Sequence, residues 1–296
     1  MNCVMVILNY NDSRRALKLA ETCKEYSTID KVVIVDNKST DDSIDYLTEN
    51  LSSDIDLCKS VHNKGFAAGN NVGAKYVVNK YAPKSLLFAN TDTIFVNDDI
   101  IACQEALDDN DKLGLVSMRM KDIHGNEERA AWKYKSFKEY LLSSFWVYMH
   151  RTYKNDRYQY NDNAVVQIVD MVRGSFMMFR TEALCKADYF DEGTFLYYEE
   201  ECISYRLKKQ NYSVGIITNH FYIHNHISTK GNNIKMKKIM DASLLYFLKK
   251  YYSIGPIKTG MFKLASKYSY LENHIIQRIK SQRNLKRGNL RKIQQL

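Results

Sequence analysis

Short apolar runs without alternating polar residues constrain the fold of this chain more than any other feature. Runs of this kind are typical of strands buried on both faces of a parallel or mixed sheet. Between them lie stretches with helical spacing, for example Ala16, Leu19, Ala20 and Cys23 at i, i+3, i+4 and i+7. The alternation of strand and helix predicts an α/β fold, most regularly over residues 1–115. The apolar runs lie at residues 3–8, 32–35, 86–88, 113–116, 175–179 and 214–217.

Two further helices are predicted by the same spacing, at residues 44–51 and 74–81. The pattern Ser39-x-x-Asp42 resembles a capping box and places a helix start there. After residue 115 the order becomes less regular. We interpret the aromatic and polar stretch at 132–163 as a helix with loops covering one side of the sheet.

Charge divides the chain near residue 230. The whole chain has a net charge of +9, but residues 231–296 hold 15 Lys and Arg against two acids. Residues 1–230 hold 28 Lys and Arg against 32 Asp and Glu, so they are mildly acidic. A change of sign on this scale indicates a boundary between a body at 1–230 and a basic extension at 231–296.

The composition places the chain among cytoplasmic proteins. No apolar run approaches the ~18–20 residues of a spanning helix. The first ten residues lack a basic segment and a cleavage site, so no signal peptide is expected. The six cysteines form no CxxC pair and are expected to be reduced thiols.

Polar residues follow the predicted strands at the point where ligands bind in open α/β sheets. Asn9 ends the first strand, Asp36 ends the second, and Asn90-Thr91-Asp92 follows the run at 86–88. The loop at 63–71 adds two glycines and several asparagines, which permit close approach of backbone to a ligand. Any one of these residues could simply make a turn or cap a helix. Their occurrence at three strand ends favours a binding site.

The glycine motifs of the common nucleotide-binding folds are absent. The first strand is followed by Leu8-Asn9-Tyr10-Asn11-Asp12-Ser13, which has no glycine, and no phosphate-binding loop motif occurs. Phosphates would then be neutralised by a divalent metal held by a carboxylate, and Asp92 is the leading candidate.

Three successive carboxylates, Glu199 to Glu201, follow an aromatic approach and precede a predicted helix. Acids are favoured in a first helical turn, which explains one or two of them. The aromatic residues could also lower the local dielectric and tune a general base. Further on, His224 and His226 are two residues apart, and one of them is a candidate metal ligand.

Taken together, the motifs resemble those of the inverting family 2 glycosyltransferases of the GT-A fold, particularly the bacterial rhamnosyltransferase-like branch. The resemblance implies a GT-A domain with a mixed, mostly parallel central sheet flanked by helices. It also implies a nucleotide-sugar half at about 1–115 and an acceptor half at about 116–230. The matching stretches are VVIVDNKSTDDS, NKGFAAGNNVGAKY, LLFANTDT, VRGSFMMFRTEAL, FDEGTFLYYEEECISYRLKKQNY and HNHIS.

The resemblance also implies roles for individual residues. Asp92 and His224 would bind Mg²⁺ or Mn²⁺, with His226 as the alternative histidine. Glu200 would be the base, with Glu199 and Glu201 as alternates, because the family usually has Glu-Asp where this chain has Glu199-Glu200. An acid often found two residues after the base is Cys202 here, which puts one acceptor contact in doubt. The nucleotide-sugar would be bound by Asn9, Asp36, Asn63, Gly65, Asn70 and Asn90.

The expected function is metal-dependent transfer of a sugar, from dTDP-rhamnose or a UDP-sugar, to a saccharide or lipid-linked acceptor in surface polysaccharide synthesis. One rival is a nucleotide-binding oxidoreductase, against which the missing glycine motif argues. The other is a non-catalytic protein that binds a membrane or a nucleic acid through its basic extension.

The extension at 231–296 is predicted to form amphipathic helices. Its apolar sets are Leu244, Phe247, Leu248 and Tyr251, and then Leu271, Ile275, Ile276 and Ile279. An apolar stripe with a basic remainder favours peripheral attachment to an anionic membrane, here the inner face of the cell membrane. The alternative is that the stripe packs on the catalytic body. No recognition module accompanies the charge, so no nucleic-acid partner is expected.

Overall fold

The computed structural model of this chain describes residues 1–145, 158–161, 163–225 and 234–293. It divides into two compact units. Unit 1 consists of Met1–Tyr134 and Arg157–Ser228, and unit 2 consists of Lys135–Asp156 and Thr229–Leu296. Each unit is described by itself.

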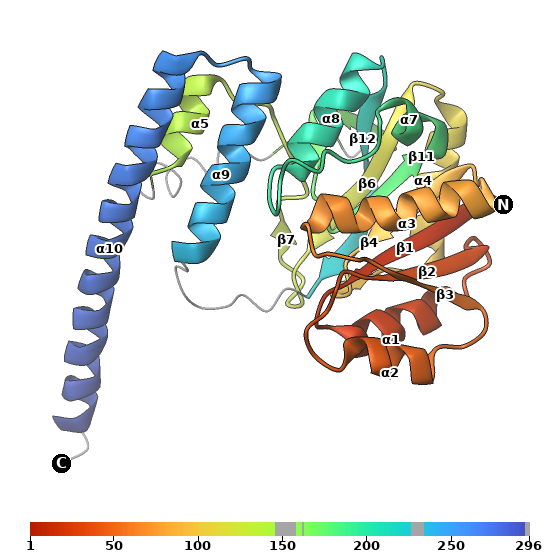
Figure 1. Cartoon of the computed structure of the whole chain (residues 1–296), viewed down its shortest axis with the longest axis horizontal. Helices are drawn as coiled ribbons and strands as arrows, with labels where there is room; N and C mark the ends of the chain where they lie inside the picture. The colour runs from red at the N-terminus through yellow and green to blue at the C-terminus, as the bar shows by residue number, and fades with distance from the viewer. Residues whose placement is uncertain (146–157, 162, 226–233, 294–296) are drawn as a thin grey trace. The chain divides into compact units, whose positions relative to one another are not determined.

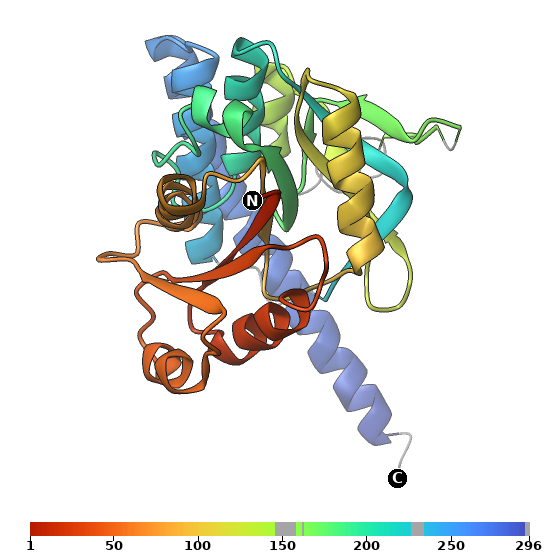
Figure 2. The ribbon, with the colours of Figure 1, turned by 90° about the vertical axis from the view of Figure 1, so that its right-hand side faces the viewer.

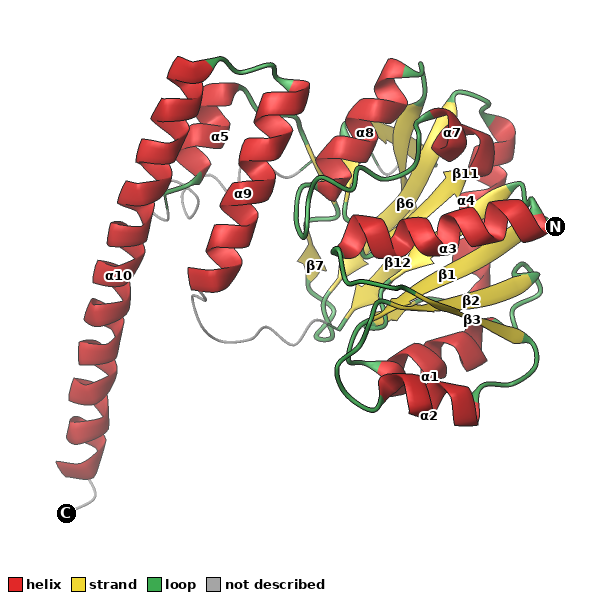
Figure 3. Ribbon diagram, viewed as in Figure 1, coloured by secondary structure: helices red, strands yellow, loops and turns green. Residues whose placement is uncertain are grey.

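Unit 1 is built on one large mixed sheet (Figures 1 and 3). Its main path has the order β3-β2-β1-β4-β11-β6-β12-β5, with parallel pairing within β3-β2-β1-β4 and between β6 and β12. The antiparallel strand β11 lies between β4 and β6. The long strands are β1 (Cys3–Asn9), β2 (Lys31–Asp36), β3 (Ile55–Lys59), β4 (Ser85–Ala89), β6 (Leu113–Lys121), β11 (Phe176–Arg180) and β12 (Ser213–His224).

Short strands complete the sheet and form a second ladder. The segments β5 (Thr93–Ile94) and β9 (Val166–Val169) pair with β12, and β7 (Glu127–Glu128) pairs with β6. A separate two-stranded ladder joins β8 (Ala131–Trp132) to β10 (Met171–Val172). The fold-class prediction is confirmed: the sheet is mixed, most of its long strands pair in parallel, and helices flank it.

Helices cover both faces of this sheet. Figures 1 and 2 show α3 and α4 on opposite faces, and α3 runs along β1 and β2. The core between these layers is apolar, and Val6, Ile34 and Phe88 in it are at most 1% exposed. The helices of unit 1 are α1 (Ser13–Cys23), α2 (Ser43–Asn50), α3 (Phe66–Tyr81), α4 (Asn97–Asp109), α7 (Thr181–Lys186) and α8 (Glu199–Lys209).

The predicted capping box at Ser39 is wrong. The helix α2 begins at Ser43, and the side chain of Asp42 at its N-cap makes no capping hydrogen bond. Arg14 holds that carboxylate from α1 through two bonds of 3.0 and 2.7 Å. The Ser39 hydroxyl instead accepts hydrogen bonds from the Asn11 N–H and the Asn9 amide, so it orders the loop after β1.

Unit 2 is helical, as predicted for the extension. It contains α5 (Phe137–Ser143), α9 (Ile234–Tyr251) and α10 (Pro256–Ile293). The apolar set Leu244, Phe247, Leu248 and Tyr251 is buried, and the Phe247 ring contacts the ring of Tyr140 on α5. This set therefore forms the core of unit 2, and its proposed exposure to lipid is not observed. No helix in the described part of the chain is long and apolar enough to cross a membrane.

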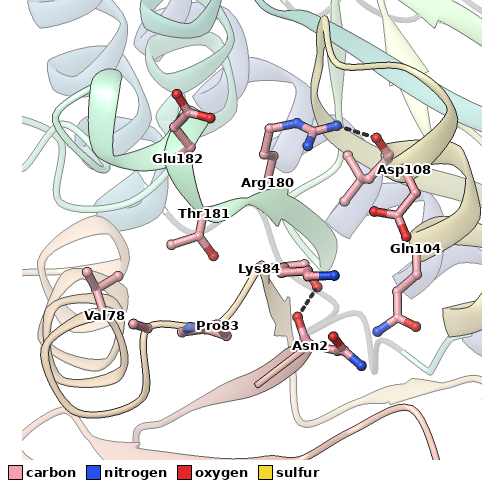
Figure 4. A pocket seen from close by; sticks show the side chains of 12 residues that line it. Asn2, Val78, Pro83, Lys84, Gln104, Asp108, Arg180, Thr181 and Glu182 are labelled. Atoms are coloured by element: carbon pink, nitrogen blue, oxygen red, sulfur yellow. Dashed lines mark hydrogen bonds between the residues drawn. The ribbon is translucent and has the colours of Figure 1, made fainter.

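A cavity of about 560 Å³ opens at the amino ends of β1 and β4 (Figure 4). Its lining includes Asn2, Lys84, Gln104 and Arg180. The guanidinium of Arg180 donates to the main-chain carbonyls of the α4–β6 connection, including that of Asn110 at 3.2 Å. The cavity lies at the opposite edge of the sheet from the polar strand ends, so it is not part of the candidate site.

Candidate functional site

The carboxyl ends of β1, β2 and β4 meet at one edge of the sheet, as the polar strand ends predict. Asn9 and Asp36 are directly opposite each other in the parallel register, and Ile7 is opposite Ala89. The Asn9 amide donates to Asp36 at 2.8 Å, and the second oxygen of Asp36 accepts the Ser39 N–H at 3.1 Å. Both Asn9 and Asp36 are almost fully buried. In this structure they order the turn after β2.

The loop at 63–71 is fixed by its glycine and its asparagines. Gly65 has φ +100°, and a Cβ there would lie 2.0 Å from the Phe195 carbonyl oxygen. Asn63 accepts the Gly65 N–H at 3.0 Å and the Asn37 amide at 3.3 Å. The Phe66 N–H then donates to the Phe195 carbonyl at 2.9 Å. The loop that begins α3 is thus joined to the segment that leads into α8.

Asn70 and Asn71 have different surroundings. The Asn70 amide donates to the Phe66 carbonyl within α3, and the side chain is 2% exposed. Asn71, absent from the predicted site, exchanges two hydrogen bonds with the Phe190 backbone and donates to Glu192 at 2.8 Å. Asn71 therefore holds the aromatic approach to α8 against α3.

Asp92 and His224 lie side by side. The short strand β5 pairs with the end of β12, which sets His224 opposite Thr93. The Asn225 N–H donates to the Asp92 carbonyl at 2.8 Å, and His224 Nε2 lies 3.2 Å from Asp92 Oδ1. Both side chains are largely buried. His226 lies outside the described residues.

Asp92 and His224 can serve as two of the ligands of one divalent cation. Carboxylate and imidazole at this separation can share one ion, because each ligand bond is only ~2 Å long. Among the residues that the structure describes, no group of three or more His, Cys, Asp or Glu side chains gathers to hold a metal. The remaining coordination positions would then fall to phosphate oxygens and water, as in many sites that act on nucleotides.

The three glutamates at the start of α8 occupy different environments. Glu199 and Glu201 are buried, whereas Glu200 is half-buried. Burial, followed by the charge of Glu200, raises the pKa of Glu201 to about 8, although the Trp132 indole N–H donates to it at 3.1 Å. Burial likewise raises the pKa of Glu199 well above its ordinary value. Both shifts favour the protonated form of these two carboxyls over the ionised form.

Glu200 is tied to the strand-end edge by the short link between β10 and β11. The Gly174 N–H donates to Glu200 Oε1 at 2.9 Å, and the next residue, Ser175, accepts the Asn90 N–H at 2.9 Å. The Ser175 hydroxyl also bonds the Tyr222 hydroxyl at 2.8 Å, two residues before His224. One link therefore connects the carboxylate of Glu200, the Asn90 motif and the strand that carries the histidine.

Backbone strain occurs next to these carboxyls. Tyr197 and Tyr198 both have positive φ angles, 73° and 69°. Consecutive non-glycine residues in the left-handed region are costly and cluster at functional sites. The turn they form delivers Glu199 to Glu201 to the first turn of α8.

The sequence did not reveal several of the residues that build this site. Gly174 acts through its backbone N–H and Ser175 through its carbonyl, and a backbone group leaves no residue-specific signal. Thr91, whose hydroxyl donates to Asp12, lies between two predicted site residues and could have been included.

Comparison with known proteins agrees with the fold of unit 1. Its mixed sheet flanked by helices is shared with solved glycosyltransferases of the GT-A fold. The family model described as "Glycosyl transferase family 2" matches residues 4–186, and the chain belongs to this family.

Two curated relatives are named as transferases. Residues of this chain are 28% identical over 150 residues to "Rhamnosyltransferase WbbL" of Escherichia coli, covering 48% of this chain and 54% of the relative. They are 25% identical over 214 residues to "Low-salt glycan biosynthesis hexosyltransferase Agl10" of Haloferax volcanii, covering 71% and 63%. The match thus spans less than two thirds of either relative.

Solved structures share the fold at low identity. GalNAc-T7 with UDP, GalNAc and Mn²⁺ has a TM-score of 0.60 at 11% identity, over 86% of this chain and 49% of that one. The mannosyltransferase PcManGT of Pyrobaculum calidifontis, with GDP-Man and Mn²⁺, has a TM-score of 0.56 at 12% identity, over 92% and 70%. TarS of S. aureus with UDP-GlcNAc scores 0.53 at 13% identity, over 91% and 72%.

Proposed function

We propose that this chain is an inverting glycosyltransferase that uses a nucleotide-sugar donor and a divalent metal. The observation that carries the proposal is the link at Gly174 and Ser175, because it ties Glu200 to the sheet edge where Asp92 and His224 lie together. Displacement of a nucleoside diphosphate in a single step requires a general base and a bound metal ion close to each other. A candidate base and a candidate metal-binding pair at one sheet edge meet that requirement.

Glu200 is the proposed base. It is the one glutamate of the three that is not buried, and the Gly174 N–H fixes one of its oxygens at 2.9 Å. The acceptor hydroxyl oxygen attacks the anomeric carbon while its proton passes to Glu200. The bond from that carbon to the diphosphate oxygen breaks on the opposite face, so one displacement inverts the centre and no covalent nucleophile is needed. Glu199 and Glu201 are buried, and burial disfavours the ionised form that accepts a proton.

Asp92 and His224 are the proposed metal ligands, with Mg²⁺ and Mn²⁺ as candidates. A divalent cation bound there supplies the positive charge that stabilises the departing diphosphate. The chain fixes the two ligands through the β5–β12 pairing and the bond from Asn225 to the Asp92 carbonyl. Two GT-A structures similar to this chain contain Mn²⁺.

The nucleotide-sugar is proposed to lie along the strand ends and the loop at 63–71. Asn63 and Gly65 shape this loop, and Asn90 begins the metal motif. Asn9, Asp36 and Asn70 are buried and bonded within the chain, so we propose that they hold the pocket wall rather than supply most of the direct contacts.

Rhamnose from dTDP-rhamnose, or a hexose from a UDP-sugar, is the proposed group transferred. The names of the two relatives, a rhamnosyltransferase and a hexosyltransferase, support this choice. The proposed acceptor is a saccharide or lipid-linked saccharide of a surface polysaccharide. The proposed division of the chain is a catalytic domain at 1–230 and a basic extension at 231–296, with Lys135–Asp156 belonging to the same compact unit as the extension.

We also propose peripheral attachment to the cytoplasmic face of the membrane through residues 231–296. Its support is charge: seven Lys and Arg residues and no acid occur from Arg278 to the end of the chain. Each such cation near an anionic surface contributes ~1 kcal/mol. Because the set at Leu244 to Tyr251 is buried, the attachment proposed here is mainly electrostatic.

A donor screen tests the proposal. Release of nucleoside diphosphate is measured for a panel including dTDP-rhamnose, UDP-glucose, UDP-GlcNAc and GDP-mannose, each with Mn²⁺, Mg²⁺ or EDTA. We expect release from one nucleotide class, dependent on the metal and increased by a saccharide acceptor. Metal-independent release, or none from any donor in the presence of a crude lipid-linked acceptor fraction, would contradict it.

A further inference from the structure

The helix α10 carries apolar side chains on its outer surface. Six of them are between 48% and 82% exposed, although large apolar residues are normally buried. Their spacing along the helix alternates strictly between four and three residues. We call this set the outer stripe, and it consists of Ile257, Met261, Leu264, Tyr268, Leu271 and Ile275.

A different face of α10 forms the core of unit 2. Phe262, Ser266 and Ser269 are buried, and the Ser266 hydroxyl bonds the buried carboxylate of Asp241 on α9. The inner face is therefore already packed within the unit. The outer stripe is a second surface of the same helix, and the fold of unit 2 does not explain it.

The spacing indicates what covers the outer stripe. An alternation of four and three residues is the seven-residue repeat of a coiled coil, in which apolar residues meet those of a second helix. Such a seam is narrower than the broad apolar face of a helix that lies on lipid. Lys258 directly follows Ile257 and Lys267 directly precedes Tyr268, which are the flanking positions where a coiled coil carries its charged residues.

We propose that the outer stripe pairs with the outer stripe of a second copy of this chain, forming an antiparallel homodimer. Antiparallel pairing centred on Ser266 sets Ile257 opposite the partner's Ile275 and Leu264 opposite the partner's Tyr268, so every stripe residue has an apolar partner.

Charge favours the antiparallel direction. A parallel pair would bring together two segments that each hold the seven cations from Arg278 onward, whereas an antiparallel pair separates them. The antiparallel register also sets Lys258 near the partner's Glu272, at positions that flank a coiled-coil seam. The dimer does not depend on the proposed catalytic function.

The experiment measures mass by sedimentation equilibrium of the full chain from 1 to 100 µM. We expect a dimer, and at least a 100-fold weaker self-association in the double variant Leu264→Glu/Leu271→Glu. Both side chains are more than half exposed, so the fold should persist, as checked by circular dichroism and by donor hydrolysis. The matched control is Ile123→Glu, which places the same charge at an exposed apolar position of unit 1 and should leave the dimer intact.

A charge exchange tests the direction. Lys258→Glu should weaken the dimer, and Lys258→Glu/Glu272→Lys should restore it. The Lys258 Nζ also lies 5.3 Å from the Phe137 ring centroid of its own chain, so loss of the dimer in Lys258→Glu alone could come from that contact. Recovery of the dimer in the double variant is therefore the result that identifies the pairing of Lys258 with the partner's Glu272. Failure of the rescue would overturn the antiparallel register.

Three outcomes would overturn the homodimer. The first is a monomer at every concentration. The second is a dimer that the stripe variants do not affect. The third is a monomer whose binding to vesicles containing anionic phospholipid is abolished by the stripe variants, because lipid would then be the occupant of the stripe.

Discussion

The two units present their surface chemistry in opposite ways. In unit 1 the candidate site consists of polar groups at strand ends, such as Asp92 and Glu200, each held by a main-chain contact from a distant segment. In unit 2 the inferred interaction surface consists of apolar side chains on one face of a single helix, with Lys258 and Glu272 beside it. A sheet edge gathers residues that are far apart in sequence, whereas a helix face gathers residues that are close.

This difference predicts that the two surfaces respond differently to mutation. Catalysis at a sheet edge depends on several side chains held in defined positions, so loss of one contact should change turnover by orders of magnitude. The free energy of association along a helix face is spread over six side chains, so replacing any one of them should weaken the dimer only in part.

The largest effect is expected for Glu200→Gln. Glutamine keeps the volume and can still accept the Gly174 N–H, but it cannot take the acceptor's proton. We expect kcat to fall by ~10²–10⁴ with little change in donor KM. The measurement is steady-state transfer, with Glu199→Gln and Glu201→Gln as matched variants. If either of these gives that loss and Glu200→Gln does not, the assignment of the base is incorrect.

Next in size is Asp92→Asn, which removes a negative charge from the proposed metal pair. We expect metal-dependent turnover to fall by ~10²–10³, since charge stabilisation of the leaving group weakens. The fold should persist, because a residue beyond the end of a strand contributes little packing. Titration of Mn²⁺ by activity and by electron paramagnetic resonance checks both parts. Unchanged Mn²⁺ affinity in a folded variant would remove Asp92 from the metal site.

The sequence predicted the elements of unit 1 better than those of unit 2, because buried strands leave continuous apolar runs. All six runs correspond to long strands, whereas β3 was missed: Asp56 and Lys59 interrupt its sequence Ile-Asp-Leu-Cys-Lys, as suits a strand at the edge of the sheet. Glu200 could be proposed, but its bond to Gly174 could not, because it joins a backbone N–H to a side chain 26 residues away.

The faces of α10 could not be assigned from sequence for a different reason. Leu271 and Ile275 were grouped with Ile276 as one apolar set, yet the first two are exposed and Ile276 is half-buried. A helix with two apolar faces does not reveal which face packs inward until its neighbours are known. Here the inward face includes serines, which the apolar pattern alone does not select.

A smaller effect, on stability, is expected for Gly65→Ala. The new Cβ would meet the Phe195 carbonyl at 2.0 Å in a residue with φ +100°, so the loop must shift. We expect unfolding free energy to fall by ~1–3 kcal/mol and donor KM to rise. Gly125→Ala is the control, because Gly125 also has a positive φ but has nothing within 4 Å of the added Cβ. Equal losses in the two variants would mean that backbone strain alone, and not the contact with Phe195, matters.

The smallest effect concerns the pH dependence of stability through Glu201. Its pKa is raised from 4.5 to about 8 in the folded chain, so between these values the folded state holds a proton that the unfolded state has lost. The unfolding free energy contributed by this group is therefore highest below about pH 4.5 and falls as pH rises toward 8. Glu201→Gln cannot ionise, and its carbonyl can still accept the Trp132 N–H.

We therefore expect the fall in stability between pH 5.5 and 7.5 to be shallower in Glu201→Gln, by up to about 1 kcal/mol per pH unit. Urea unfolding at several pH values measures this slope. Burial is the largest cause of the shift of the Glu199 pKa and is the same in both proteins, whereas the smaller effect of the Glu201 charge is lost in the variant. Parallel slopes for the two proteins would show that Glu201 stays ionised in the folded state. Its negative charge would then lie beside Glu200 and would have to be counted in any account of the base.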